Sequence, residues 1–182
     1  MARICLLTGA SGADATGLFC DDAAIADVYA TPYLEGPGGF ALVWDEGAGP
    51  VGYVLGTDDT RAFQAWFVET WWPSRPQREQ RTQGDRWLLP SAADGDRMLI
   101  DALDEHPAHL HIDLLPEAQG RGAGRQLIEA ACSLLAERGV PGVHLVASKD
   151  NAGAQAFYPR VGFSPIAQDG GSVTFARRLH QP

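Results

Sequence analysis

The stretch Gln119-Gly120-Arg121-Gly122-Ala123-Gly124 follows an apolar segment, leads directly into a helix-forming one, and decides the fold. Its three glycines let the backbone come close to a ligand and turn several amide N–H groups toward one point. Residues 123–138 then carry apolar side chains at helical spacing, and the N-terminus of such a helix adds free donors and a positive dipole end. Together with Arg121 and Arg125, the stretch predicts a site for a diphosphate.

The class of diphosphate is narrowed by what this stretch lacks. A P-loop ends in Gly-Lys-Ser/Thr, and no lysine stands here. A dinucleotide-binding fingerprint needs glycine where Arg125 stands and an acidic residue at the end of the next strand, which residues 143–147 lack. Both nucleotide interpretations are therefore weak, and a Gly-rich turn that merely begins a helix remains an alternative.

The hydrophobic pattern predicts a mixed α/β domain over residues 1–182. Strands are expected at residues 40–44, 51–55, 108–115, 143–147, 163–166 and 172–176, and helices at residues 21–33, 60–72, 123–138 and 151–158. Turn residues join the first two and the last two strands into hairpins. Residues 74–96 are polar and interrupted by proline and glycine, which predicts a long loop or lid. This order favours one largely antiparallel sheet with helices on both faces.

Composition limits the partners. The net charge of −9 argues against nucleic acid and anionic membrane surfaces. It could favour a cationic substrate such as an amine, although improved solubility explains it as well. No apolar run approaches the roughly 20 residues of a membrane-spanning helix. Cys5, Cys20 and Cys132 are odd in number and widely spaced, and without an export signal they predict buried thiols in the cytoplasm.

A second stretch changes the interpretation of the glycine loop. Residues 151–163 read Asn-Ala-Gly-Ala-Gln-Ala-Phe-Tyr-Pro-Arg-Val-Gly-Phe, which resembles the signature Asn-x-x-Ala-x-x-aromatic/aliphatic-Tyr-x-x-x-Gly-Phe of the GNAT N-acetyltransferases. Residues 119–124 match that family's other signature, Gln/Arg-x-x-Gly-x-Gly/Ala, at the expected separation. Residues 107–116, with the opening around residues 3–9, look like the bacterial relatives of the acetyltransferase-like C-terminal domain of O-GlcNAcase.

The resemblance implies the GNAT fold, in which two strands of a mostly antiparallel mixed sheet splay apart. It also implies acetyl-CoA as cofactor, with the pantetheine arm lying along the strand and the pyrophosphate on the loop. The cofactor-binding residues that it implies are Asp113, Leu114, Leu115, Gln119, Gly120, Arg121, Gly122, Ala123, Gly124, Arg125, Asn151, Ala154, Phe157 and Tyr158. The family normally begins with a strand before its first helix, and we expect that strand to be absent here.

Catalysis by such a protein requires an acid and a base. The resemblance points the hydroxyl of Tyr158 at the thioester sulfur, and a phenol with a pKa near 10 can donate a proton there. Pro159 should end or bend the helix at Tyr158. Asp113 or His111, acting directly or through water, is the candidate base, and a bulge near Asp113 is expected to open the sheet and supply an oxyanion donor.

A metal site at His106, His109 and His111 is not expected, because only two of these side chains share a face of the strand. The expected acceptor is a small-molecule or protein amine, and the expected assembly is a monomer or homodimer. A cofactor-binding module without turnover, acting in sensing or scaffolding, stays open as the alternative function. The tryptophans Trp66, Trp71 and Trp72 either line a substrate cleft or pack in the core.

Overall fold

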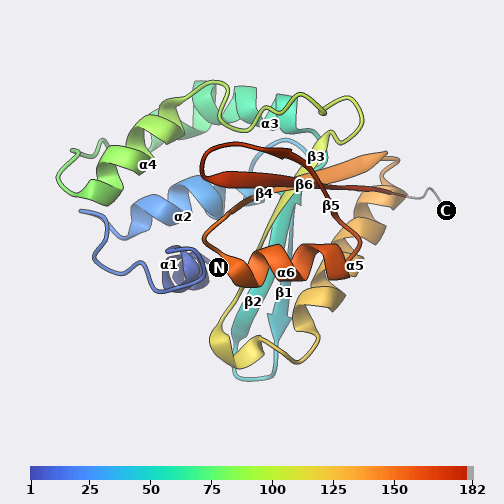
Figure 1. The fold of residues 1–182 in the computed structure, drawn as a ribbon. Coiled ribbons are helices and arrows are strands. Elements are labelled where there is room, and N and C mark those ends of the chain that lie inside the picture. Colours follow the sequence, from blue (N-terminus) through green and yellow to red (C-terminus); the bar gives the residue numbers. More distant parts are fainter. Residues whose placement is uncertain (180–182) are drawn as a thin grey trace.

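A six-stranded sheet carries the fold in the computed structural model, which describes residues 1–179 (Figure 1). Its strands are β1 Gly39–Asp45, β2 Pro50–Thr57, β3 Ala108–Leu114, β4 Gly142–Ser148, β5 Ser164–Gln168 and β6 Ser172–Arg178. The α-helices are α1 Ala2–Thr8, α2 Ala23–Tyr29, α3 Thr60–Trp66, α4 Gln83–Ala93, α5 Ala123–Glu137 and α6 Ala152–Arg160. Shorter helical turns are η1 Thr31–Leu34, η2 Phe67–Trp71, η3 Trp72–Ser74 and η4 Pro116–Ala118.

The strand order is β1-β2-β3-β4-β6-β5, and every neighbouring pair is antiparallel except β3 with β4. That parallel pair is joined only at Ala108–Val143 and His109–His144. Beyond these two pairs β3 stays with β2 and β4 stays with β6, so the sheet divides. The prediction of a largely antiparallel sheet with a splayed pair of strands is confirmed.

The prediction of a bulge near Asp113 is wrong, because the pairing of β3 with β2 shows no bulge there. The register between these strands runs evenly from Thr57–His109 to Gly52–Leu114. The sheet opens instead because β3 and β4 lose their pairing after His109. An even register keeps the alternation of side chains along β3 intact, so His109, His111 and Asp113 share one face as predicted.

Two hydrophobic cores cover the two faces of the sheet. One gathers around α5 and α6 and includes Val54, Leu110 and Ile128. The other gathers around α1, α2 and α3 and includes Tyr53, Leu55 and Phe63. Adjacent residues of β2 thus face opposite cores, as the pleat of a strand requires. Figure 1 shows α5 and α6 together, with α2, α3 and α4 grouped apart from them.

The N-terminal half departs from the predicted helices. The segment 21–33 is divided into α2 and the turn η1, which begins at Thr31 with Pro32 behind it. The segment 60–72 is divided into α3 and the π-turn η2. The first strand in the chain is β1, after α1 and α2, in agreement with the expected absence of an N-terminal strand.

The long loop predicted at residues 74–96 is wrong, because α4 occupies Gln83–Ala93. A reciprocal capping box begins this helix: the Thr82 hydroxyl accepts from the Asp85 amide, and the Asp85 carboxylate accepts from the Thr82 amide. Gly84 and Pro90 lie inside the helix, and because both residues have low helix propensity the sequence pattern does not predict a helix there. Within the described residues no helix is long and apolar enough to cross a membrane.

The C-terminal half follows the prediction closely. α5 ends before Gly139, whose φ of 79° suits the position after a helix. β5 and β6 form the expected hairpin through residues 169–171. The expected end of the last helix at Tyr158 is wrong, since α6 continues through Pro159 to Arg160. Pro159 stands in the final turn, where it disturbs only the very end of the helix.

Candidate active site

The glycine loop forms the first part of the site. Gly120 and Gly122 have φ angles of 73° and 88°, in the left-handed region that favours glycine. Gly122 immediately precedes α5, a helix of 15 residues, and nothing lies close to the position that a side chain on Gly120 would take. The loop therefore exposes backbone amides at a helix N-terminus, which is an arrangement suited to an anion.

The two arginines of the loop differ in position. Arg125 lines the groove beside the loop, and its Nη2 donates to the Arg160 carbonyl at 2.6 Å. The Arg121 guanidinium is exposed and donates to Glu46 at 3.3 Å. Arg125 thus places its positive charge in the groove, whereas Arg121 lies outside the groove.

The groove beside the loop has a volume of about 820 Å³. Of the predicted cofactor-binding residues, those that line it are Asp113, Leu114, Gln119, Gly120, Gly122, Gly124, Arg125, Asn151, Ala154, Phe157 and Tyr158. Ala123 is buried and does not line the groove. Gly124 is tightly packed, because a Cβ there would come within 3.2 Å of both Leu114 and Phe157.

Asn151 begins the helix on the opposite wall of the groove. Its Oδ1 accepts from the Ala154 amide at 2.9 Å, as the sequence predicts for a helix cap. Asn151 therefore positions α6 as well as lining the groove.

The backbone of β3 offers its free edge to the groove. The Leu115 amide donates to the Val51 carbonyl at 2.9 Å, which assigns the amides of Leu115 and Asp113 to the β2 side by the alternation of an antiparallel pair. The peptide N–H and C=O groups of Ile112 and Leu114 therefore point to the other edge of β3, where β4 has moved away and left a gap. The Leu114 carbonyl accepts from Gln119 Nε2 at 2.9 Å. Ile112 lines the groove with its peptide groups turned to the gap.

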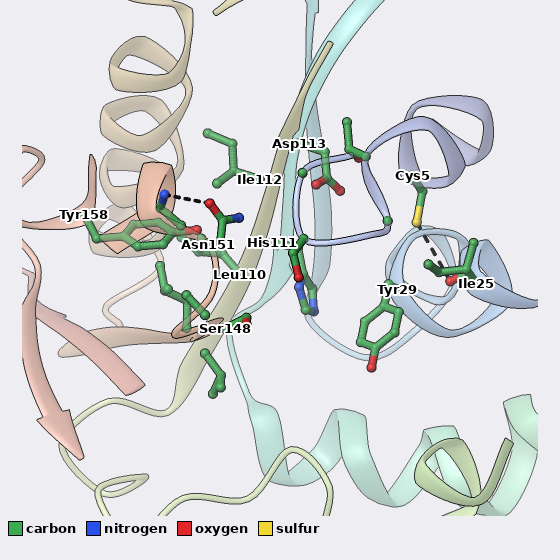
Figure 2. Close-up of a pocket in the computed structure, with 18 of the residues that line it drawn as sticks. Cys5, Ile25, Tyr29, Leu110, His111, Ile112, Asp113, Ser148, Asn151 and Tyr158 are labelled. Carbon is green, nitrogen blue, oxygen red and sulfur yellow. Dashed lines mark hydrogen bonds between the residues drawn. The ribbon is translucent and has the colours of Figure 1, made fainter. Parts of the chain in front are cut away.

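A second hollow, of about 300 Å³, adjoins the groove on the other side of the gap. Its walls include Cys5 from α1, Tyr29 from α2, Trp87 from α4, and His111 and Asp113 from β3. Asp113, Asn151, Ala154 and Tyr158 line both hollows. Figure 2 shows Tyr158 and Asn151 on one side of β3, with Asp113, Cys5 and Tyr29 on the other.

The sequence did not reveal Cys5, Tyr29 or Trp87 as residues of the site. Trp66, Trp71 and Trp72 pack around the second core, whereas Trp87 lines the hollow and stacks on Tyr29 with ring centroids 6.4 Å apart. The capping box at Thr82 was the one local signal that could have placed Trp87 on a helix.

Asp113 is a half-buried carboxylate that lacks a cationic partner among the described ion pairs. Burial raises its pKa, against the lowering effect of hydrogen bonds from Tyr53 and Thr8. The Tyr53 hydroxyl donates to Asp113 Oδ2. A carboxylate with a raised pKa is a stronger base than an exposed one.

The neighbouring thiol of Cys5 is not activated. Burial, aided by the charge of Asp113, raises the pKa of Cys5 to about 12, and its Sγ donates to the Ile25 carbonyl at 3.8 Å. Cys5 is therefore a neutral part of the wall. Cys132 is buried too, but Cys20 is exposed, so the prediction that the cysteines are buried holds for two of them.

His111 stands beside Asp113 on the same face of β3. Burial lowers the pKa of His111 to about 3, so its imidazole is neutral at pH 7. Its ring meets the edge of Tyr29 at a centroid distance of 5.6 Å. His144 is structural, with Nδ1 at 2.9 Å from the His106 carbonyl.

Tyr158 reaches the junction of the two hollows from α6. Its ring packs on Phe163 and Phe175 at centroid distances of 5.9 and 5.3 Å. Among the described residues its hydroxyl has no hydrogen-bond partner, yet it is not sealed from the cavity. Burial, with a contribution from Asp113, raises the pKa of Tyr158 above its ordinary value, so the phenol keeps its proton at pH 7.

Known proteins resemble this chain in sequence and in fold. A mycothiol acetyltransferase of Beutenbergia cavernae is 35% identical over 96 residues, which cover 47% of this chain and 32% of that protein. The [ribosomal protein bS18]-alanine N-acetyltransferase of Salmonella typhimurium is 32% identical over 118 residues, 61% of this chain and 78% of that protein. The chain spans 18% to 36% of the length of the mycothiol acetyltransferases that it matches.

The crystal structure of a protein named SsHAT superposes on this chain with a TM-score of 0.86 at 38% sequence identity. The superposition covers 97% of this chain and 91% of SsHAT. The family model described as "Acetyltransferase (GNAT) family" matches residues 17–163, which include strands β1 to β4, the glycine loop and α6. The chain belongs to the GNAT acetyltransferase family.

Proposed function

We propose that this chain transfers an acetyl group from acetyl-CoA to a primary amine of a small molecule or protein, by direct attack in a ternary complex. The observation that carries the proposal is the meeting of two hollows at Asp113 and Tyr158. One hollow leads to the glycine loop, and the other extends to His111, Tyr29 and Trp87. Cofactor and acceptor would therefore approach the same point from opposite sides of β3 (Figure 2).

The groove fits coenzyme A by its chemistry. Gly120, Gly122 and Arg125 place amides and a guanidinium where a diphosphate would bind. The free peptide groups of Ile112 face the gap, where the pantetheine amides could pair with them like an added strand. When bound, acetyl-CoA supplies an acetyl thioester whose thiolate is the leaving group.

The second hollow fits an amine. Asp113 is a half-buried carboxylate, and no lysine or arginine is among the described residues that line the hollow. An ammonium group entering it is therefore attracted by Asp113, and the nearest like charge is set behind the wall, where Arg97 lies over the Tyr29 ring at 5.4 Å from its centroid. Tyr29 and Trp87 add an aromatic wall that favours a cation or an apolar flank of the acceptor.

The residues at the junction can divide the proton transfers. Asp113 or His111 removes a proton from the ammonium, which leaves the electron pair on nitrogen for attack. The β3 peptide N–H groups that face the gap are the donors for the oxyanion. Tyr158 holds a proton at pH 7 and gives it to the departing sulfur.

Finer affiliations belong to the same proposal. The similarity of residues 107–116 to the bacterial relatives of the O-GlcNAcase domain supports a place among them. Three cysteines without a disulfide support a reducing compartment such as the cytoplasm. The assembly is proposed to be a monomer or homodimer.

Release of coenzyme A thiol from acetyl-CoA across a panel of amines tests the function. The panel should hold small primary amines, amino sugars and a peptide that begins with alanine, with mass spectrometry of the acetylated product. We expect thiol release that depends on at least one amine. Tight acetyl-CoA binding without amine-dependent release would overturn the proposal in favour of a binding module.

A further inference from the structure

Four side chains form a continuous hydrogen-bonded line that ends at His111. Thr60 Oγ1 lies 2.9 Å from His109 Nδ1, and the Tyr33 hydroxyl lies 2.7 Å from His109 Nε2. The same hydroxyl lies 2.9 Å from His111 Nε2. Tyr33, Thr60 and His109 are all buried, so water does not compete for these bonds. Nothing in the sequence joins these residues, since they lie on η1, α3 and β3.

The donors in this line can be assigned from its fixed end. The Thr60 hydroxyl donates its one proton to the Pro107 carbonyl at 2.6 Å, and the Thr60 amide donates to the same carbonyl at 2.8 Å. A carbonyl has no proton to return, so Thr60 Oγ1 can only accept from His109. His109 therefore carries its proton on Nδ1.

The assignment then propagates along the line. Burial holds the pKa of His109 well below its ordinary value, so the ring is neutral and its Nε2 is a lone pair. Tyr33 must donate its proton to that lone pair, and its oxygen then accepts from His111 Nε2–H. Since His111 is also neutral, its remaining nitrogen, Nδ1, carries a lone pair.

This lone pair faces the acceptor hollow. His111 is partly exposed and lines the hollow, whereas its Nε2 is occupied by Tyr33. Among the described residues Nδ1 has no hydrogen-bond partner, and it is not among the unpaired atoms that are sealed from solvent. Figure 2 shows the ring extending from β3 toward Tyr29 at the side of the hollow.

We infer that Thr60, His109 and Tyr33 are positioning residues, which lock the tautomer of His111 and present Nδ1 as the atom that deprotonates the acceptor. The inference deepens the proposed function and rests on it. In the step, an ammonium N–H bond breaks, its electron pair stays on the amine, and the proton moves to Nδ1. Asp113, two residues along the same face, lines the same hollow as His111.

The hydrogen-bonded line fixes the tautomer of His111, but it does not carry the proton onward from His111. Onward transfer would stop at Thr60, whose hydroxyl is committed to a peptide carbonyl. It would also leave a buried imidazolium at His109 without a counter-charge. The stack of Tyr33 on Phe63, with centroids 4.5 Å apart, holds the phenol in place between the two imidazoles.

The tautomers can be measured in the free protein without turnover. Long-range ¹H–¹⁵N correlation spectra of the histidine rings at pH 7.5 should show His109 protonated at Nδ1 and His111 protonated at Nε2. Two residues on one strand face would thus have opposite tautomers. The same tautomer at both positions would overturn the lock, even if the protein acetylates amines.

A matched pair of variants tests the link to catalysis. Thr60→Val removes the hydroxyl at nearly constant shape, and Thr60→Ser keeps it. We expect Thr60→Val to mix the tautomers and to lower kcat by about 10- to 100-fold, part of what a general base contributes. Thr60→Ser should restore both, and the acetyl-CoA Kd should stay unchanged in both variants. Equal kcat in the two variants would overturn the positioning role.

A third variant addresses the case in which Thr60→Val does not fold. Tyr33→Phe keeps the stacked ring and removes the shared hydroxyl, so the same loss of kcat and mixed tautomers are expected. His144→Gln is the control, because it removes a buried histidine outside the line and should leave the His111 tautomer unchanged. A wild-type chain that acetylates no amine would instead refute the proposed function.

Discussion

Replacing Tyr158 by phenylalanine tests the acid at the junction of the two hollows. The change removes one oxygen and keeps the ring, whose contacts with Phe163 and Phe175 at centroid distances of 5.9 and 5.3 Å remain. The hydroxyl has no hydrogen-bond partner among the described residues, so the folded protein loses no bond. We therefore expect the free energy of unfolding to change by less than about 1 kcal/mol.

The expected effect on turnover is much larger. A positioned general acid contributes about 10²- to 10⁴-fold, which corresponds to about 2.7–5.4 kcal/mol of transition-state stabilisation. Because the proton is needed only as sulfur leaves, kcat and kcat/KM should fall together, with the acetyl-CoA Kd nearly unchanged. The assay is thiol release at saturating acetyl-CoA and amine, beside calorimetric titration of acetyl-CoA. An unchanged kcat would remove Tyr158 from the mechanism.

Three further perturbations address the base, the anion site and α4. Asp113→Asn removes the negative charge that attracts the ammonium, so KM for the amine should rise about tenfold or more while the acetyl-CoA Kd is kept. An unchanged KM would contradict the role of Asp113. Gly122→Asp places a negative charge in the anion site and should raise the acetyl-CoA Kd at least about tenfold. Gly139→Asp is the control, because Gly139 has a similar φ of 79° at the other end of α5, and it should leave the Kd unchanged. For Asp85, burial is outweighed by hydrogen bonds from Thr82 and Cys20, which lower its pKa to about 2. A lowered folded pKa gives stability that is present above pH 4 and is lost as the pH falls toward 2, so acid should lower the Tm of the wild type more than that of Asp85→Asn.

The sequence predicted the half of the molecule in which local signals agree. Helix α5 has a glycine loop before it, an apolar stripe along it and Gly139 after it, and all three point to the same element. The hairpins β1–β2 and β5–β6 are joined by turn residues of the expected kind. Local chemistry alone specifies such elements.

The features that were missed depend on contacts between distant segments. α4 contains Gly84 and Pro90, which lower its helix propensity, and its place is fixed by the Asp85 carboxylate, which accepts from the Cys20 amide far back in the chain. α6 continues through Pro159, although the residue before a proline disfavours helical geometry. In both cases tertiary packing overrides local preference.

The active site, too, has a part that local sequence predicts and a part that depends on contacts between distant segments. The loop at residues 119–125 and the polar face of β3 follow from signatures and strand alternation. The acceptor hollow does not, because three separate helices, α1, α2 and α4, contribute wall residues that include Cys5, Tyr29 and Trp87. The tautomer of His111 depends on Tyr33, which is 78 positions away in the chain.

A crystal structure of the chain with acetyl-CoA tests the central claim most directly. The pyrophosphate should lie on the amides of residues 120–125, and the pantetheine should follow Ile112 through the gap between β3 and β4. The acetyl carbon should then lie between the Tyr158 hydroxyl and the hollow that contains Asp113 and His111. A cofactor bound elsewhere, or an acetyl group that points away from this junction, would contradict the account.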